Sequence, residues 1–593
     1  MTLTIEQFEK IVVPLCMTAK RKRCQSYSTA LQKPRLEAKP ESEEFAIISL
    51  FERIFSFHLR PDSPGEAFGP MLQMEGKRSA IPADLTKEQR EFLATLLPKV
   101  ADEEMRARIA DTLWELKHGK ATFFASEAVR AYLTAAEQSE EDGWRYEADH
   151  YARTLRIYAS MKRADKDGEL GIVVTDKLLQ AAKNSSVNGH PYLTMKLVGL
   201  LNNSGIEGAI DFVSIISEIA EKFENEGNFN AAHDAWLLLG RLYHSDDKFD
   251  KVTYTATRAA DTFVKMADAS EREPNPSYMQ ICSWLQSAVS AYRQIKGGKE
   301  RADELYLRLA SLQPRIHGEM QRHSVNIDIT ESVKEAIAHV SDRNALGAIM
   351  AAAFYRFPSS REALQKHVAE KAEAGPLAHM LAATYHDKHG RVVARKELEE
   401  PEENHLHRAA AEIRSMQPAL FIRPALAQIR FEHAISFREW VDFLHSHPFV
   451  PEHSRMTYAR GLYHGFHGDY VAAACILMPQ VEKSLRHILK EAGEETSKLN
   501  ADGLQEEKSL SQLLEMRALE NILGKDLLFD LRGLLVEKVG DNFRHLMMHG
   551  LLDDDDMESS LPVYFYWLIL HMIFSPLDRK GLDLGKRPPD KAA

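Results

Sequence analysis

The sequence predicts an all-α protein, with an N-terminal helical, tetratricopeptide-like or solenoid region followed by a C-terminal helical bundle. Apolar residues recur with helical spacing through most of the 593 residues. Alternating strand-like runs are nearly absent, and they would be needed for extended sheets. Hydrophobic residues make up 44% and charged residues 27% of the chain. These fractions are ordinary for globular domains with large buried cores.

The length predicts three to five domains, and changes in composition place the boundaries. A basic cluster, Lys20 to Arg23, separates two helical segments near the start; we interpret it as a solvated helix face, with a nucleic-acid contact as the alternative. The predicted regions are 1–85 (N-terminal helices and a Pro/Gly-rich linker), 86–315 (helical repeats), 316–455 (helical connecting domain), 456–576 (helical bundle) and 577–593 (flexible tail).

Net charge, cysteine usage and hydropathy limit the class of protein. The formal charge of −12 argues against a general polyanion binder, so any nucleic-acid contact must be local. None of the four cysteines forms a C-x-x-C pair, which predicts no zinc knuckle or disulfide framework and fits a reducing cytoplasm. Residues 1–10 show no signal-peptide pattern, and the longest apolar run, 561–574, is too short to span a bilayer. We therefore expect a cytoplasmic protein with no membrane contact.

The clearest repeat lies at Trp236. Trp236, Leu239, Gly240 and Tyr243 match the pattern W-x-x-L-G-x-x-Y of the first helix of a tetratricopeptide repeat. The second helix matches less well, because Val252 and Ala256 stand where Ala and Phe are usual. Stacked helix pairs present a concave surface that binds other molecules, so this region predicts a site for a protein partner or trigger. An irregular helical domain is the alternative.

Nine histidines between residues 317 and 407 raise the question of a metal site. Their spacing is scattered and includes no H-E-x-x-H helix motif. His386 and His389 are three residues apart, but Gly390 follows, which favours a loop over a rigid site. We interpret the nine as surface residues and predict no metal and no cofactor; they are His317, His323, His339, His367, His379, His386, His389, His405 and His407.

Helical periodicity is strongest after about residue 458. The first long helix, 471–492, carries an apolar stripe of Leu477, Val481, Leu485 and Ile488. Two further helices are predicted over 509–523 and 526–539, and an apolar helix over 561–574 closes the region. Asp541 or Asn542 is placed to cap a short helix between them. The acidic run 553–556 is interpreted as a solvated helix start rather than a metal site.

That short helix carries Arg544 and His549, with four residues between them. The spacing alone is uninformative, because arginine and histidine recur at similar distances elsewhere, as in Arg460 and His467. The context is more specific: a capping Asn542 precedes the pair, His545 follows the arginine directly, and apolar helices flank the segment. The structural alternative is a helix cap and a satisfied core polar group.

The segment resembles the HEPN superfamily (higher eukaryotes and prokaryotes nucleotide-binding). The resemblance rests on Arg544, His545 and His549, and on three further stretches of the C-terminal region: 465–469, 479–486 and 529–535. It covers about a fifth of the chain, and His545 stands where asparagine is usual. It implies a bundle of four or five helices that forms a two-fold homodimer, with both motifs facing one RNA-binding groove.

The resemblance further implies metal-independent RNA cleavage, with Arg544 and His549 catalytic and Asn542 and His545 supporting. Elementary chemistry agrees. RNA supplies its own nucleophile in the 2′-hydroxyl, a histidine can move the proton, and a guanidinium can hold the phosphate.

The sequence thus predicts an endoribonuclease with a helical sensor region, by analogy a toxin or an anti-phage defence effector. The alternative is a non-catalytic dimeric scaffold, or an RNA- or partner-binding protein. A nucleotide-binding regulator lacks support, since no P-loop or Rossmann glycine pattern is present.

Overall fold

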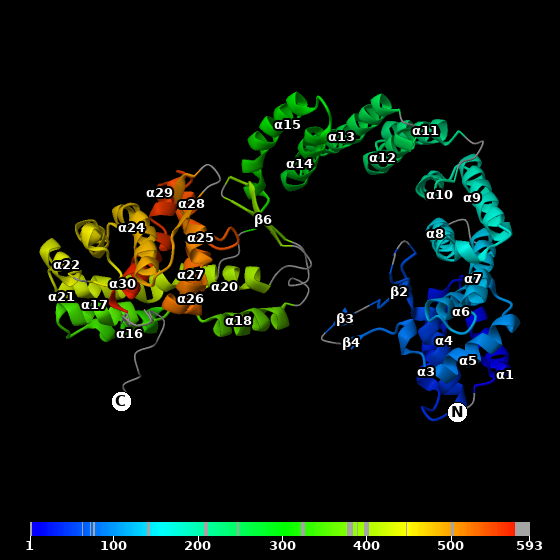
Figure 1. Cartoon of the computed structure of the whole chain (residues 1–593), viewed down its shortest axis with the longest axis horizontal. Coiled ribbons are helices and arrows are strands. Elements are labelled where there is room, and N and C mark those ends of the chain that lie inside the picture. Colours follow the sequence, from blue (N-terminus) through cyan, green and yellow to red (C-terminus); the bar gives the residue numbers. More distant parts are fainter. Residues whose placement is uncertain are drawn as a thin grey trace. The chain divides into compact units, whose positions relative to one another are not determined.

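The chain folds into two compact units, Met1–Gln313 and Pro314–Ala593. The computed structural model describes residues 3–61, 63, 65–71, 73–74, 77–138, 143–206, 211–245, 248–321, 326–375, 383–387, 389–396, 402–445, 447–499 and 503–575. The predicted tail, 577–593, lies outside these residues. Helices dominate both units, so the predicted all-α class is confirmed (Figure 1).

In the first unit each helix contacts the next along the chain from α6 to α15 (Figure 1). Its helices are α1 (Ile5–Gln7), α2 (Val13–Met17), α3 (Cys24–Glu37), α4 (Glu43–Ser56), α5 (Lys87–Leu96), α6 (Glu103–Glu115), α7 (Ala121–Glu137), α8 (Trp144–Met161), α9 (Glu169–Val187), α10 (Pro191–Asn203), α11 (Phe212–Asn225), α12 (Phe229–Ser245), α13 (Phe249–Glu271), α14 (Tyr278–Gln294) and α15 (Lys299–Leu312). Shorter turns are η1 (Phe8–Val12), η2 (Pro82–Asp84), η3 (Leu97–Lys99), η5 (Lys162–Ala164) and η6 (Gln313–Gly318).

The tetratricopeptide-like motif occupies α12, which packs on α13. Trp236 and Leu239 are buried between helices, as the motif requires. Gly240 has a specific reason to be glycine, because a Cβ there would lie 2.9 Å from Thr255 Oγ1 on α13. The small residue lets the two helices approach closely, and the stack continues through α14 and α15.

The second unit is a helical bundle around a central apolar helix, α30. Its helices are α16 (Thr330–Val340), α17 (Ala345–Phe354), α18 (Arg361–Ala374), α20 (Glu402–Gln417), α21 (Arg423–Glu432), α22 (Phe437–Phe443), α23 (Arg455–Phe466), α24 (Tyr470–Glu491), α25 (Leu510–Leu514), α26 (Arg517–Leu523), α27 (Lys525–Leu535), α28 (Phe543–Met548), α29 (Asp554–Met557) and α30 (Ser560–Phe574). Shorter turns are η7 (Pro418–Ile422) and η8 (Glu452–Ser454).

The helix α30 is buried on every side from Pro562 to Ile573 and contacts α17, α20, α23 and α24. A helix that is apolar all round needs such an enclosure. Asp553 caps α29 just before it, so the acidic run begins a helix as predicted. The predicted helix 509–523 is wrong in one respect: it is broken at Glu515 and Met516 into α25 and α26.

The predicted boundaries at 85 and 455 both pass through continuous cores. One core cluster runs from Phe8 to Leu201, and another runs from Ala336 to Ile573. In the second, Trp440 of the predicted connecting domain and Tyr458 of the predicted bundle belong to the same cluster. The helices of 316–455 therefore form part of the structure that supports the C-terminal bundle.

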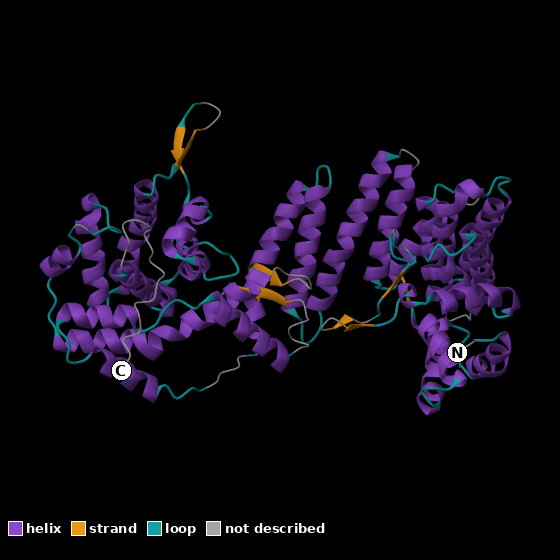
Figure 2. Cartoon of the chain, turned by 60° about the horizontal axis from the view of Figure 1, so that its bottom comes forward, coloured by secondary structure: helices purple, strands orange, loops and turns teal. Residues whose placement is uncertain are grey.

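Strands among the described residues form four two-stranded antiparallel hairpins (Figure 2). In the first unit β1 (His58–Leu59) pairs with β2 (Phe68–Gly69), and β3 (Gln73–Met74) pairs with β4 (Lys77–Arg78). In the second unit β5 (Ala383–His386) pairs with β6 (Val392–Lys396), and β7 (Ser497–Leu499) pairs with β8 (Gln505–Glu507). The first two hairpins lie in the region predicted to contain a Pro/Gly-rich linker, and β5 and β6 flank Gly390, where a loop was favoured. In all four hairpins the period-two signal is too short to read.

Candidate functional site

The loop before α28 determines where the helix that carries the candidate residues begins. Asn542 adopts the left-handed conformation with φ 50° and ψ 31°, and its side chain makes no capping hydrogen bond. The predicted cap is therefore wrong: Asn542 turns the chain, a conformation that asparagine tolerates better than most residues. Phe543 directly after it is buried and packs against Phe565 of α30, with ring centroids 5.7 Å apart. Together the turn and this anchor fix where α28 starts.

Arg544 lies in the first turn of α28 at the surface of the bundle. Its side chain is 35% exposed, and Nη2 lies 3.5 Å from Oε2 of Glu482 on α24. Glu482 also accepts a hydrogen bond from Arg486, whose guanidinium donates to the carbonyl of Lys508 at 2.8 Å. One carboxylate thus orients two guanidinium groups. Arg544 is held in place and still reaches solvent.

His545 and His549 are exposed on the same short helix and its C-terminal cap. Their ring centroids are 4.4 Å apart, so the two imidazoles are in contact. A spacing of five residues turns side chains about 140° apart around a helix, so His549 does not share the face of Arg544. We call Arg544, His545 and His549 the Arg–His patch.

Two exposed apolar side chains adjoin the Arg–His patch in sequence. Met548 is 52% exposed and Leu551 is 38% exposed. Contiguous apolar patches rimmed by polar residues mark interaction sites, whereas single exposed apolar side chains are ordinary.

Beneath the Arg–His patch lies a buried ionic network that the sequence analysis did not find. Arg414 of α20 donates from Nε to Asp541 Oδ2 at 2.6 Å and from Nη1 to Asp530 Oδ1 at 2.8 Å. Tyr564 of α30 donates to the other oxygen of Asp530 at 2.8 Å. Burial raises the pKa of Asp541 above its ordinary value, against the opposing effect of the Arg414 guanidinium. Asp541, predicted as a possible cap, instead ties the loop before α28 to the core.

His407 corrects the prediction that the histidines between 317 and 407 are surface residues. It is buried on α20, and its ring stacks on Phe529 of α27 with centroids 4.2 Å apart and an interplanar angle of 2°. Neither ring nitrogen has a hydrogen-bond partner among the described residues. Burial, with nearby arginines, lowers the pKa of His407 to about 3. It is a neutral aromatic packing residue, which spacing in the sequence cannot reveal.

The basic cluster near the start of the chain is largely exposed. Lys20, Arg21 and Lys22 are solvent-exposed in the turn before α3, while Arg23 places its guanidinium 4.5 Å from the ring centroid of Tyr146. Three of the four residues thus lie in solvent, as predicted, but they lie in a turn and not on the face of a helix. The alternative of a nucleic-acid contact stays a prediction.

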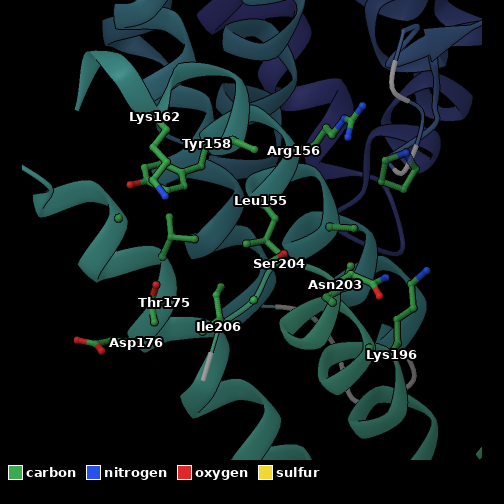
Figure 3. A pocket seen from close by; sticks show the side chains of 18 of the residues that line it. Leu155, Arg156, Tyr158, Lys162, Thr175, Asp176, Lys196, Asn203, Ser204 and Ile206 are labelled. Carbon is green, nitrogen blue, oxygen red and sulfur yellow. The ribbon is translucent and has the colours of Figure 1, made fainter. Parts of the chain in front are cut away.

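The described part of the first unit contains a groove of about 970 Å³ (Figure 3). It lies between α8, η5, α9, α10 and the turn after α10, and Arg241 of α12 also reaches it. Four basic side chains and a single acidic one, Asp176, line it; the basic residues are Arg156, Lys162, Lys196 and Arg241. Sequence analysis singled out none of them, because they come from four separate elements.

The described residues contain no group of three or more His, Cys, Asp or Glu side chains arranged to hold a metal ion. Across the same residues, every helix is too short or too polar to cross a bilayer.

Residues 1–169 match a domain of unknown function, DUF7380. No curated protein of similar sequence was found. A solved circular tandem repeat protein with novel repeat topology and enhanced subunit contact surfaces aligns over 95% of this chain and 96% of its own. That alignment has 11% identity and a TM-score of 0.14, so we infer nothing from it.

Proposed function

We propose that this chain is a metal-independent endoribonuclease of the HEPN type, in which Arg544 and His549 are catalytic and His545 and Asn542 support them. The observation that carries the proposal is the Arg–His patch itself. A half-exposed guanidinium oriented by Glu482 and two exposed imidazoles lie within six residues on the surface of a helical bundle. The structural alternative of a satisfied core polar group would instead bury the histidine, and His549 is exposed.

The proposed chemistry uses only groups of the protein and the RNA. An imidazole takes the proton of a ribose 2′-hydroxyl, whose oxygen forms a new bond to the adjacent phosphorus. The bond from phosphorus to the 5′-oxygen breaks, and that oxygen takes a proton from a second imidazole. The guanidinium of Arg544 stabilises the negative charge on the phosphoryl oxygens. The products are a 2′,3′-cyclic phosphate and a free 5′-hydroxyl.

A second copy of the chain completes this proposed site. Arg544 and His549 lie on different faces of α28, so one protomer does not bring them to a common point. A two-fold axis beside α28 would place the histidine of one copy opposite the arginine of the other. The exposed apolar side chains of Met548 and Leu551 are suited to such an interface.

The first unit is then the proposed sensor, and the enzyme a toxin or an anti-phage effector that is held inactive until triggered. Stacked helix pairs such as α12 and α13 are suited to recognising a partner. Growth arrest on expression, relieved by His549→Ala, would support this role. Arrest that persists in His549→Ala would contradict it.

The direct test uses the purified full chain. Wild type, Arg544→Ala and His549→Ala are incubated with total RNA in the presence of EDTA, beside Arg517→Ala, which removes an exposed arginine elsewhere in the same unit. We expect cleavage by wild type and Arg517→Ala, and a loss of at least 100-fold in the other two variants. Cleavage that EDTA abolishes, or that survives both patch substitutions, would contradict the proposal.

A non-catalytic scaffold is the second candidate, and the contact between Arg544 and Glu482 favours it. In that account the ion pair only ties α28 to α24. Glu482→Gln separates the two accounts, because a scaffold would lose stability and show no RNA cleavage in either form. An enzyme would cleave RNA as wild type and more slowly as Glu482→Gln, because Arg544 loses its orienting partner.

A further inference from the structure

The groove in the first unit has an unbalanced charge. Arg156, Lys162 and Arg241 have no ion pair with any described residue, and Lys196 adds a fourth basic side chain to the lining. Asp176 is the single acidic lining residue. The whole chain carries a net charge of −12, so a local excess of positive charge is not a by-product of composition. It favours a negatively charged occupant.

The middle of the groove is apolar. Leu155 of α8, Met195 and Leu200 of α10, and Ile206 after it are half-buried, and Ile172 of α9 is 61% exposed. Figure 3 shows Leu155 and Ile206 at the centre of the groove, with Lys162 on one side and Arg156 and Lys196 on the other. The charges therefore lie around an apolar centre instead of converging on one point.

The walls are held together by the fold itself. Gly171 of α9 lies so close to Tyr158 of α8 that a Cβ would sit 2.1 Å from the tyrosine oxygen. That hydroxyl donates to Asp165 at 3.3 Å, and the same carboxylate accepts the backbone N–H of Gly171 at 2.9 Å. Asp165 is thus engaged within the wall by two neutral donors and is not among the residues that line the groove. The hollow is preformed, which lowers the entropic cost of filling it.

We propose that this groove binds an acidic segment of a partner protein that places an apolar side chain between carboxylates. A free phosphate would need several donors at one point, and here Lys162 lies on the side away from Arg156 and Lys196 (Figure 3). Single-stranded RNA would need aromatic faces for its bases, and Tyr158 is the one aromatic lining residue, with its hydroxyl bonded to Asp165. The volume is at the upper end of the roughly 300–1,000 Å³ range of small-molecule pockets, which suits a short peptide.

The proposal is independent of the ribonuclease chemistry, because every residue that carries it lies in the first unit. It is tested on the full chain with a fluorescein-labelled peptide that alternates pairs of glutamate with pairs of leucine. Fluorescence anisotropy at low salt measures binding. We expect saturable binding that the double substitution Arg156→Glu and Lys162→Glu weakens at least ten-fold.

The matched control is Arg145→Glu with Arg163→Glu, which makes the same charge change on the same elements with residues that do not line the groove. It is expected to bind like wild type. A second pair tests the apolar centre: Ile172→Glu should weaken binding, whereas Val187→Glu, an exposed residue of the same helix, should not. Circular dichroism verifies that all variants are folded.

Several results would overturn the proposal. One is the absence of saturable binding to the acidic peptide. A second is equal weakening by the groove variants and their controls. A third is preferential binding, at this groove, of an oligouridine RNA or of inorganic phosphate over the peptide, which would assign the groove to a different ligand.

Discussion

Arg414 Nε lies 2.6 Å from Asp541 Oδ2, and this buried contact joins α20 to the loop that leads into α28. Asp541 also donates its backbone N–H to the carbonyl of Gly533 at 2.9 Å. Because Asn542 and Arg544 follow within three residues, the position of the Arg–His patch depends on a side chain more than one hundred residues earlier in the chain.

Substitution of Arg414 tests that dependence. Arg414→Met leaves Asp530 and Asp541 without their buried cation, and breaking a buried pair in this way costs about 3–5 kcal/mol. We expect a marked fall in the unfolding temperature of the second unit, measured by differential scanning calorimetry. Arg517→Met, which removes an exposed guanidinium on α26 of the same unit, is the control. Equal stability of the two variants would show that the network does not hold the loop.

The buried His407 predicts a dependence of stability on pH. Its pKa is lowered to about 3 in the folded chain from an ordinary value of 6.5, so between these pH values the unfolded chain binds a proton that the folded chain does not. Stability contributed by neutral His407 is therefore present above pH 6.5 and falls as the pH drops, by up to about 1.4 kcal/mol per pH unit.

Thermal unfolding of wild type and His407→Leu between pH 7.5 and 5 measures this effect. This pH range brackets the ordinary pKa of histidine, about 6.5. The variant should lose part of the slope. Burial also lowers the pKa of His447 and of His571, so some slope will remain. Identical slopes in wild type and variant would contradict the assignment of His407 as a neutral packing residue.

Two glycines within helices of the first unit predict opposite effects of the same substitution. A Cβ at Gly240 would meet the buried Thr255 hydroxyl at 2.9 Å, so Gly240→Ala should destabilise the unit by about 1–2 kcal/mol. At Gly199 the nearest side-chain atom is Leu238 Cδ1 at 3.8 Å, so Gly199→Ala should stabilise it by up to about 1 kcal/mol. The unfolding temperatures of the two variants should move in opposite directions, and movement in the same direction would contradict the packing described for α12 and α13.

The exposed apolar side chains after Arg544 predict the position of a dimer interface. If two copies meet beside α28, Met548→Glu combined with Leu551→Glu should convert a dimer into the 67.2 kDa monomer and abolish RNA cleavage. Multi-angle light scattering measures the mass. Met456→Glu, a substitution at an equally exposed methionine on α23, should leave a dimer intact. A wild-type chain that is monomeric at every concentration would contradict the proposed two-fold site.

Much of this fold could be predicted from the sequence because a helix shows itself in the local spacing of apolar residues. The stripe from Leu477 to Ile488 lies in α24, and the apolar run 561–574 lies in α30, close to the expected limits. The short hairpins were missed because strands of two to five residues carry too little alternation to detect. The shared cores across residues 85 and 455 were missed because packing between distant helices leaves no local signal.

The candidate site was predictable only in part, for the same reason. Arg544, His545 and His549 are close in sequence and could be singled out together. Glu482, which orients Arg544, and Arg414, which fixes Asp541, pair with them across 62 and 127 residues, and the sequence contains no pattern that joins them. The groove between α8 and α10 was missed because its basic residues become neighbours only when the helices pack.

The most direct measurement of the central claim uses a DNA oligonucleotide that contains one ribonucleotide, incubated with the purified chain and EDTA. Mass spectrometry of the products identifies the cleaved bond and its new ends. The account predicts a single cut after the ribonucleotide, a 2′,3′-cyclic phosphate end, and no cut by Arg544→Ala, by His549→Ala or in a 2′-O-methyl substrate. Cleavage of the 2′-O-methyl substrate, or wild-type cleavage that His549→Ala retains in full, would contradict it.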